Sequence, residues 1–197
     1  MSIKAERKYL AHYIDINPLG DPATATTETT NYVRIGKDLE EYIENLNPDV
    51  STAKNILGEN NVIHNGFDVS SDVDPFYVRL DGSTPEEMAQ KLMYIANERL
   101  TGTGTQTTKV DVLVDASGTV IWAYRENIVI VPNSVGGDTS GVQVPFSVYN
   151  DGSRTSGTWD TSTKAFTPAS GTNSNSNTNA NSNTNNNSGD TVTQGEG

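Results

Sequence analysis

The sequence has no cysteine, few basic residues and no long apolar run. Without cysteine there can be no disulfide framework, no thiolate metal site and no cysteine nucleophile. No apolar run approaches the ~18 residues that a membrane helix needs. Residues 1–8 lack the apolar core of a signal peptide. We therefore expect a protein that is made in the cytoplasm and carries no export signal.

Acidic residues outnumber basic ones. The 197 residues include 13 Lys and Arg against 25 Asp and Glu, so the formal net charge at pH 7 is −12. Binding of nucleic acid through counterion release requires basic patches. The composition therefore argues against a protein that holds DNA or RNA, and it fits a surface to which nucleic acid does not stick.

Motifs for catalysis and metal binding are absent as well. The two histidines, His12 and His64, have no second histidine at a ligand spacing such as i+4, so no zinc site is predicted. No Gly-x-Ser-x-Gly motif is present. Asp68, Asp72 and Asp74 crowd one segment but miss the EF-hand pattern, and we interpret them as solvated. The sequence predicts no catalytic residue, no cofactor and no metal, and hence no enzyme.

A series of β-strand signals fills the second half of the chain. Residues 109–115 alternate, with valines on one face and Lys109 and Asp111 on the other. Residues 116–119 suit a turn, and Asn-Asp-Gly-Ser at 150–153 suits a hairpin turn. The strands expected here are residues 109–115, 120–124, 128–131, 142–149, 155–159 and 164–167. Short strands with turns at this spacing indicate an antiparallel sandwich or barrel.

The first hundred residues add three short strands and one helix. The strands are expected at residues 9–16, 32–36 and 76–80. The helix is expected at residues 85–100, because its apolar residues form one stripe that can pack on a sheet. The stripe consists of Met88, Leu92, Ile95 and Ala96. The predicted fold is mainly β (α+β), an antiparallel β-sandwich with one flanking helix.

Residues 39–46 admit two interpretations. Their apolar residues fall at the i, i+3, i+4 and i+7 positions of a helix: Leu39, Tyr42, Ile43 and Leu46. The sequence Asn47-Pro48 would end such a helix. The local pattern therefore favours a helix, although pairing with other strands can override local propensity.

The long segment at residues 49–74 is polar and rich in turn residues. It carries two apolar islands, Ile56-Leu57 and Val62-Ile63, and it is punctuated by Gly58 and Gly66. We expect a long hairpin or an extended loop. Loops of this length are usually functional or disordered.

The C-terminal tail has a different composition from the rest of the chain. Residues 171–187 contain nine Asn interleaved with Ser and Thr and a single Ala. Such an uncharged polar composition cannot bury a core, so disorder is expected. We therefore divide the chain into a folded domain at residues 1–167 and a low-complexity tail at residues 168–197.

Nine short fragments along residues 5–167 form a pattern when they are taken in order. They are 36–41 (Gly-Lys-Asp-Leu-Glu-Glu), 47–49 (Asn-Pro-Asp), 55–60 (Asn-Ile-Leu-Gly-Glu-Asn), 73–77 (Val-Asp-Pro-Phe-Tyr), 131–134 (Val-Pro-Asn-Ser), 136–141 (Gly-Gly-Asp-Thr-Ser-Gly), 145–146 (Pro-Phe), 151–154 (Asp-Gly-Ser-Arg) and 157–159 (Gly-Thr-Trp). In this order and spacing they resemble the tail tube (major tail) proteins of long-tailed bacteriophages of Gram-positive bacteria. The asparagine-rich tail is not part of that family pattern.

The resemblance implies a structural virion protein. In that family, six copies form a ring, the inner sheets of the six copies join into one β-barrel, and the rings stack into a hollow tail tube. Phage DNA is ejected through the lumen without specific binding. The implied partners are further copies of the chain, the tape measure protein, and the tail-terminator and baseplate proteins. Contractile-tail particles use related subunits, so the type of particle stays open.

The resemblance also implies a site of assembly. A long hairpin in the family reaches the neighbouring ring, which here corresponds to residues 49–74, and residues 39–46 would be a strand leading into it. The implied assembly residues are Ile56, Leu57, Gly58, Val62, Ile63, Asp68, Asp72 and Asp74. An alternative function is a non-catalytic carbohydrate- or receptor-binding sandwich, in which Trp122, Trp159 and tyrosines would form a stacking platform.

Overall fold

The computed structural model describes residues 4–20, 30–37, 39, 41–80 and 84–169. Most of the predicted tail, from residue 170 onward, lies outside the described residues. Among the described residues, no helix has the length and apolar character needed to cross a membrane.

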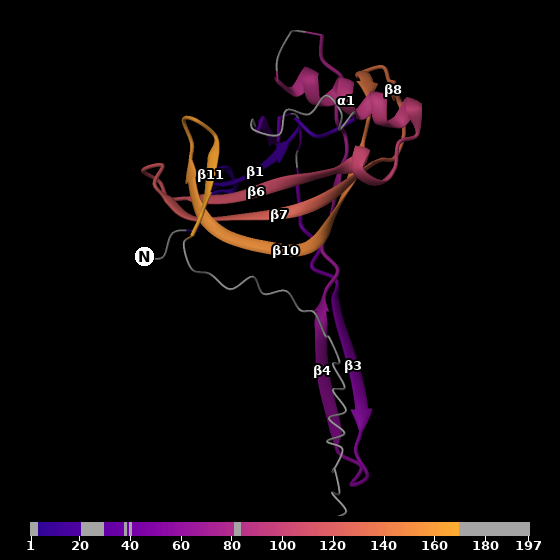
Figure 1. The fold of residues 1–197 in the computed structure, drawn as a ribbon, viewed down its shortest axis with the longest axis vertical. Coiled ribbons are helices and arrows are strands. Elements are labelled where there is room, and N and C mark those ends of the chain that lie inside the picture. Colours follow the sequence, from indigo (N-terminus) through magenta and orange to yellow (C-terminus); the bar gives the residue numbers. More distant parts are fainter. Residues whose placement is uncertain (1–3, 21–29, 38, 40, 81–83, 170–197) are drawn as a thin grey trace, which may run out of the picture.

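Seven strands form one antiparallel sheet that curls (Figure 1). The strand order is β11-β10-β7-β6-β1-β2, and β5 pairs with β10 beside this path. The strands are β1 (Leu10–Asp15), β2 (Tyr32–Ile35), β5 (Ser70–Val73), β6 (Gln106–Val114), β7 (Val120–Pro132), β10 (Phe146–Asp160) and β11 (Ala165–Pro168). Pro168, which the sequence assigns to the tail, thus still belongs to the sheet.

Two two-stranded ribbons, one α-helix and two short 3-10 helices complete the described structure. The ribbons are β3 (Pro48–Lys54) with β4 (Asn60–Phe67), and β8 (Gly136–Asp138) with β9 (Gly141–Gln143). The helices are η1 (Arg7–Tyr9), α1 (Thr84–Glu98) and η2 (Gly102–Thr105). The predicted antiparallel, mainly β fold with one flanking α-helix is confirmed.

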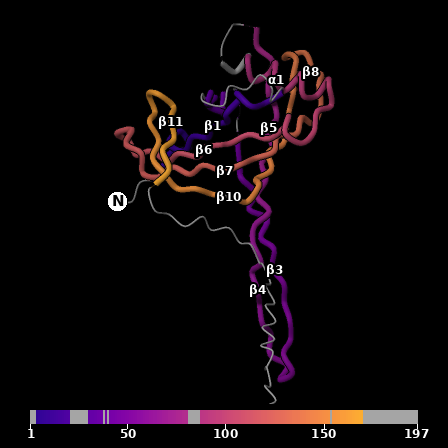
Figure 2. Tube along the Cα trace, in the orientation of Figure 1, coloured from indigo at the N-terminus to yellow at the C-terminus, as the bar shows by residue number. Residues whose placement is uncertain are grey.

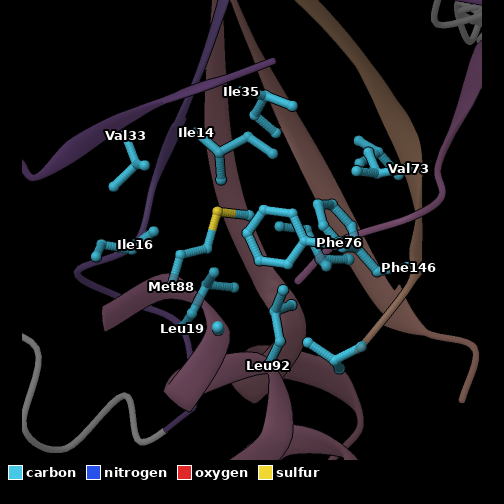
Figure 3. Packing of buried hydrophobic residues seen from close by; sticks show 14 of the residues in the cluster. Ile14, Ile16, Leu19, Val33, Ile35, Val73, Phe76, Met88, Leu92 and Phe146 are labelled. Atoms are coloured by element: carbon cyan, nitrogen blue, oxygen red, sulfur yellow. The ribbon is translucent and has the colours of Figure 1, made fainter. Parts of the chain in front are cut away.

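The main core lies between α1 and one face of the sheet. Met88, Leu92 and Ile95 of the predicted stripe are fully buried there. Figure 3 shows Met88 and Leu92 pointing toward Phe76 and Phe146, whose rings meet edge to face at 5.3 Å. Helix formation and sheet packing therefore rest on the same apolar stripe.

A second, smaller core lies on the opposite face of the sheet, near β11. Trp159 is 5 % exposed, and its ring lies 4.7 Å from that of Tyr13 and 5.4 Å from that of Tyr32. Val110 and Val112 of β6 belong to this cluster, so the predicted alternation along β6 is confirmed.

The predicted hairpin turn at residues 150–153 is wrong, because β10 runs through it without a break. The pairing of β10 with β7 shifts register between Asn150, opposite Ile128, and Arg154, opposite Glu126. Three residues of β10 therefore face the single Asn127 of β7 in a bulge, in which Gly152 adopts a φ of +72°. The turn-forming residues produce a bend inside a long strand.

Strand limits elsewhere also differ from the prediction. Residues 120–124 and 128–131 belong to the single strand β7, whereas residues 142–149 are divided between β9 and β10. Pro145, which has no backbone N–H, stands at that division. The strand predicted at residues 76–80 is reduced to one bridge between Tyr77 and Gln143.

Both interpretations of residues 39–46 are wrong for the described part of this segment. It contains neither helix nor strand, only a single bridge between Asn45 and Ser70. Exposure alternates, since Tyr42 is buried and Ile43 exposed. Tyr42 packs on His12 and Glu44 reaches Lys109. These contacts place every second side chain on the sheet, which a helix cannot do.

Replacing Gly157 with alanine should destabilise the protein. A Cβ atom at this position would overlap with the Phe166 ring and with the backbone oxygen of Thr167 in β11. We expect a loss of about 1–3 kcal/mol in the free energy of unfolding, measured by urea denaturation. Gly66→Ala, whose Cβ would meet open space, is the matched control, and equal effects of the two substitutions would contradict the packing of β11 on β10.

Candidate assembly surface

The ribbon formed by β3 and β4 projects away from the body of the molecule, on the side opposite α1 (Figures 1 and 2). Apart from the half-buried Gly66, every residue of the two strands is exposed. This confirms that the segment predicted as a long hairpin or loop contains a hairpin. An isolated two-stranded hairpin is marginally stable in water, so the ribbon is a candidate for support by a partner.

The tip of the ribbon is ordered by Asn55. Its side-chain oxygen accepts hydrogen bonds from the N–H groups of Leu57 (3.0 Å) and Glu59 (2.9 Å). Gly58 supports the turn with a φ of +80° and donates its N–H to the carbonyl of Asn55 at 3.0 Å. The tip is therefore shaped by its own hydrogen bonds.

Large apolar side chains are exposed along the ribbon. Ile56 is 103 % exposed and Leu57 is 76 % exposed, both at the tip. The further exposed residues of this kind are Val50, Val62, Ile63 and Phe67. Contiguous exposed apolar surface marks interaction sites. The apolar islands seen in the sequence thus both lie on the exposed ribbon.

The structure separates the eight predicted assembly residues into two groups. Ile56, Leu57 and Gly58 lie at the tip, and Val62 and Ile63 lie on opposite faces of β4. The three acidic residues lie at or beyond the base of the ribbon: Asp68, Asp72 and Asp74. Asp72 lies in β5 and accepts a hydrogen bond from Ser147 at 2.5 Å.

Hydrogen bonds at the base join the ribbon to β5. Asn47, with a φ of 40°, donates its side-chain amide to the Asp68 carbonyl at 2.8 Å. Its own carbonyl accepts the Asp68 N–H at 3.1 Å. Asn45 and Ser70 exchange two backbone hydrogen bonds, of 2.8 and 3.0 Å. The direction of the ribbon is thus set by residues 45–47, which follow the segment that crosses the sheet.

That crossing segment is fixed to the helix-facing side of the sheet by Tyr42 and Glu44. The Tyr42 ring lies 4.5 Å from the ring of His12, and burial raises the pKa of its hydroxyl to about 12. Glu44 forms a salt bridge with Lys109 of β6. The two residues cover a polar region of the sheet that α1 does not reach.

Beneath this segment lies a buried ion cluster, defined here as Lys109, Glu44, Asp111, Glu126 and His12. Lys109 is only 1 % exposed, and its Nζ lies 3.4 Å from Asp111 Oδ2 and 3.4 Å from Glu126 Oε2. His12 Nδ1 lies 2.7 Å from Asp111 Oδ1. A buried cation surrounded by three carboxylates compensates their charge at the cost of desolvating all of them.

The charges of the cluster stabilise one another. Burial alone would raise the pKa of Asp111, but the hydrogen bond with His12 and the charge of Lys109 outweigh burial and hold that pKa below its ordinary value of 3.8. Arg154 adds a partly exposed guanidinium, with its Nε 3.6 Å from Glu126 Oε1. Asp111 is therefore held as a carboxylate.

Three members of the cluster have the geometry of possible metal ligands. Ligand atoms of His12, Glu44 and Asp111 lie within 4.8 Å of one another. The ammonium group of Lys109 contacts Glu44 and lies near Asp111. It supplies the positive charge that a metal would otherwise bring, so we interpret the group as an internal salt-bridge cluster.

No pattern in the sequence identifies this cluster as a unit. The alternation along residues 109–115 shows that Lys109 and Asp111 share a face. It does not show that residues 41–46, more than sixty positions earlier, cover that face. The sequence predicts that His12 is not a metal ligand. Its pairing with Asp111 depends on the alignment of β1 with β6.

The platform expected for a carbohydrate-binding module does not form. Trp159 is buried in the second core, on the face opposite Trp122. Trp122 lies beside Tyr124, with ring centroids 5.5 Å apart, and the guanidinium of Arg154 lies over the Tyr124 ring at 4.3 Å. The two tryptophans therefore cannot stack on one sugar.

Comparison with known proteins gives only distant likenesses. No family model matches the chain, and no curated protein matches its sequence. One similar solved structure is the sheath/tube terminator of an extracellular contractile injection system, PVC, in its extended state (9 % identity, TM-score 0.43, 76 % of this chain and 94 % of that chain). Another is the tube-terminating cap of the anti-feeding prophage (11 % identity, TM-score 0.42, 76 % and 88 %). Likenesses this distant do not assign a role.

Lys109→Met should be strongly destabilising. The substitution keeps most of the side-chain volume but leaves Glu44, Asp111 and Glu126 without their central cation. Breaking a buried ion pair in this way costs about 3–5 kcal/mol, measurable as the change in the free energy of unfolding in urea. Lys54→Met, on the exposed ribbon, is the control and should change stability by less than about 0.5 kcal/mol. A cluster without structural importance would give the same small effect at both positions.

The lowered pKa of Asp111 predicts that the stability of the protein depends on pH. Because its pKa is lower in the folded protein than the ordinary 3.8, its contribution to stability is fully present above that value and is lost as the pH falls through the folded-state pKa. Stability measured by chemical denaturation should therefore fall on acidification below about pH 4. Asp111→Asn should be less stable near neutrality and show a shallower acid dependence; an unchanged slope would exclude this assignment.

Proposed function

We propose that the protein is a structural subunit that assembles with copies of itself into rings, which stack into the hollow tail tube of a phage or a phage-like particle. The observation that carries this proposal is the β3–β4 ribbon. The ribbon has an ordered tip and exposes apolar side chains along its length. It projects away from the body of the molecule, so the rest of the described chain does not cover it.

The open edges of the sheet support self-assembly. Among the described strands, β2 pairs only with β1, and β11 pairs only with β10. Exposed edge strands can pair with other chains, and closing a ring of subunits is one way to satisfy them. A ring in which the edge of one copy meets a different edge of the next would use both ends of the sheet.

The part of the opposite face that lies beyond the Trp159 cluster supports a DNA conduit. Ile128 of β7 faces α1, so Asn127 and Val129 face the other way. The same face presents Gln106 and Tyr149. Arg125 also lies there, but its guanidinium stacks on the Phe166 ring at 5.1 Å. A lumen lined by such polar side chains in an acidic subunit would not retain phosphates.

The proposed role also agrees with the chemistry of the ion cluster. Its titratable groups contact one another beneath Tyr42 and Glu44 and are engaged in structural salt bridges. In the proposed assembly the subunit would lie in the virion tail, around a tape measure protein, with terminator and baseplate proteins at the two ends. DNA would pass through the lumen without specific contacts.

Removing the ribbon tests the proposal. The full chain at high concentration should give rings or tubes by negative-stain electron microscopy. In the test variant, an Asn-Gly turn replaces residues 49–66 and joins the paired Pro48 and Phe67. It should keep the circular dichroism signature of a folded β protein but remain monomeric by light scattering.

Ile121→Ser provides the control for that experiment. It removes an exposed apolar side chain from the body rather than from the ribbon, and it should leave tube formation unchanged. Only monomers of the full chain across salt and pH, or tubes formed by the variant that lacks the ribbon, would overturn the proposal.

A further inference from the structure

The surface of the described chain contains an apolar groove on the side opposite the ribbon. It lies between the C-terminal end of α1 and the C-terminal end of β7 and has a volume of about 550 Å³. Its apolar lining includes Ile95, Leu100, Val131 and Val135, of which Val131 and Val135 are exposed. Arg99 is the single charged residue among those that line it.

We propose that this groove receives the ribbon tip of a second copy of the chain. The inference rests on the proposed function, since it names the surface on which one ring would hold the next. Ile56 and Leu57 would enter the apolar part of the groove, and Glu59 would lie against Arg99. The contact joins two different surfaces of the same chain, so it can repeat without limit along one direction.

The chemistry of the two surfaces favours this pairing. The tip presents two exposed apolar side chains next to one carboxylate. The groove presents apolar side chains next to one guanidinium, which Arg99 offers from the left-handed position (φ 51°) that follows α1. Leu100 completes the helix end by donating its N–H to the Ile95 carbonyl at 3.0 Å.

Another groove of similar volume fits the tip less well. It lies near β1 and β2, and five basic residues line it: Arg7, Lys8, Arg34, Lys37 and Lys164. Docking the tip there would remove several cations from water against apolar side chains, which is unfavourable. It would also bring Lys54, next to the tip, toward charges of its own sign.

The geometry of the molecule allows the contact. The ribbon points away from the body on one side, and α1 lies on the other (Figure 1). Seven residues of β3 extend the ribbon by roughly 23 Å. Because Asn55 already shapes the tip through hydrogen bonds, docking would immobilise little that is not already ordered, and such preorganisation favours binding.

Disulfide cross-linking tests the contact directly, because the chain has no cysteine of its own. The full chain carrying Ile56→Cys and Val135→Cys should, on mild oxidation, give a ladder of covalent multimers on non-reducing gels. Formation of the bond requires Cβ atoms about 4 Å apart. Each single variant should give dimers at most.

Ile56→Cys with Lys164→Cys is the matched control, because Lys164 lines the basic groove. If this pair gave the ladder and Ile56→Cys with Val135→Cys did not, the tip would dock in the basic groove, and the inference would be overturned. Electron microscopy of the same samples before oxidation tests the docking site and the proposed function separately. Tubes that give no ladder with Ile56→Cys and Val135→Cys would reject the docking site alone. Monomers in all samples would reject the proposed function as well.

A charge exchange provides an independent measurement. Glu59→Lys and Arg99→Glu, introduced singly, should each raise the protein concentration needed for tube formation roughly two- to fivefold. The double variant should return this concentration to that of the unmodified chain, because the two opposite charges are then exchanged but still paired. Glu98→Lys, an exposed neighbour that does not line the groove, should have no such effect. Additive losses in the double variant would contradict the contact.

Discussion

The burial of one ammonium group, that of Lys109, determines how the chain leaves the sheet. Its position in the middle of β6 requires carboxylates from neighbouring strands and from the crossing segment, because an unpaired charge cannot stay buried. Glu44 supplies the contact from the crossing segment. This holds residues 42–45 against the sheet, and the ribbon departs from the point where those residues meet β5.

This arrangement separates two parts of the molecule with opposite properties. The body buries apolar clusters on both faces of its sheet, one beneath α1 and one around Trp159. The ribbon buries almost nothing and exposes Ile56 and Leu57. The ion cluster lies between the body and the ribbon and fixes the direction of the ribbon, because salt bridges and hydrogen bonds depend on geometry more than apolar contacts do. The ribbon can therefore be exposed and still be directed.

Much of the fold is readable in the sequence. The stripe of α1, the alternation along β6 and the apolar islands of the ribbon all predict what the structure contains. Turn chemistry is less specific, because Asn-Asp-Gly-Ser at residues 150–153 serves equally in a hairpin and in a bulge. The ion cluster is not readable, because alternation identifies the two faces of a strand but not the distant segment that covers one of them.

The ion cluster also has a thermal consequence. The cost of removing charged groups from water falls as temperature rises, whereas the contribution of apolar burial levels off. The attachment of the crossing segment through Lys109 and Glu44 thus gains relative strength on warming, while contacts around Met88 and Phe146 do not gain in the same way.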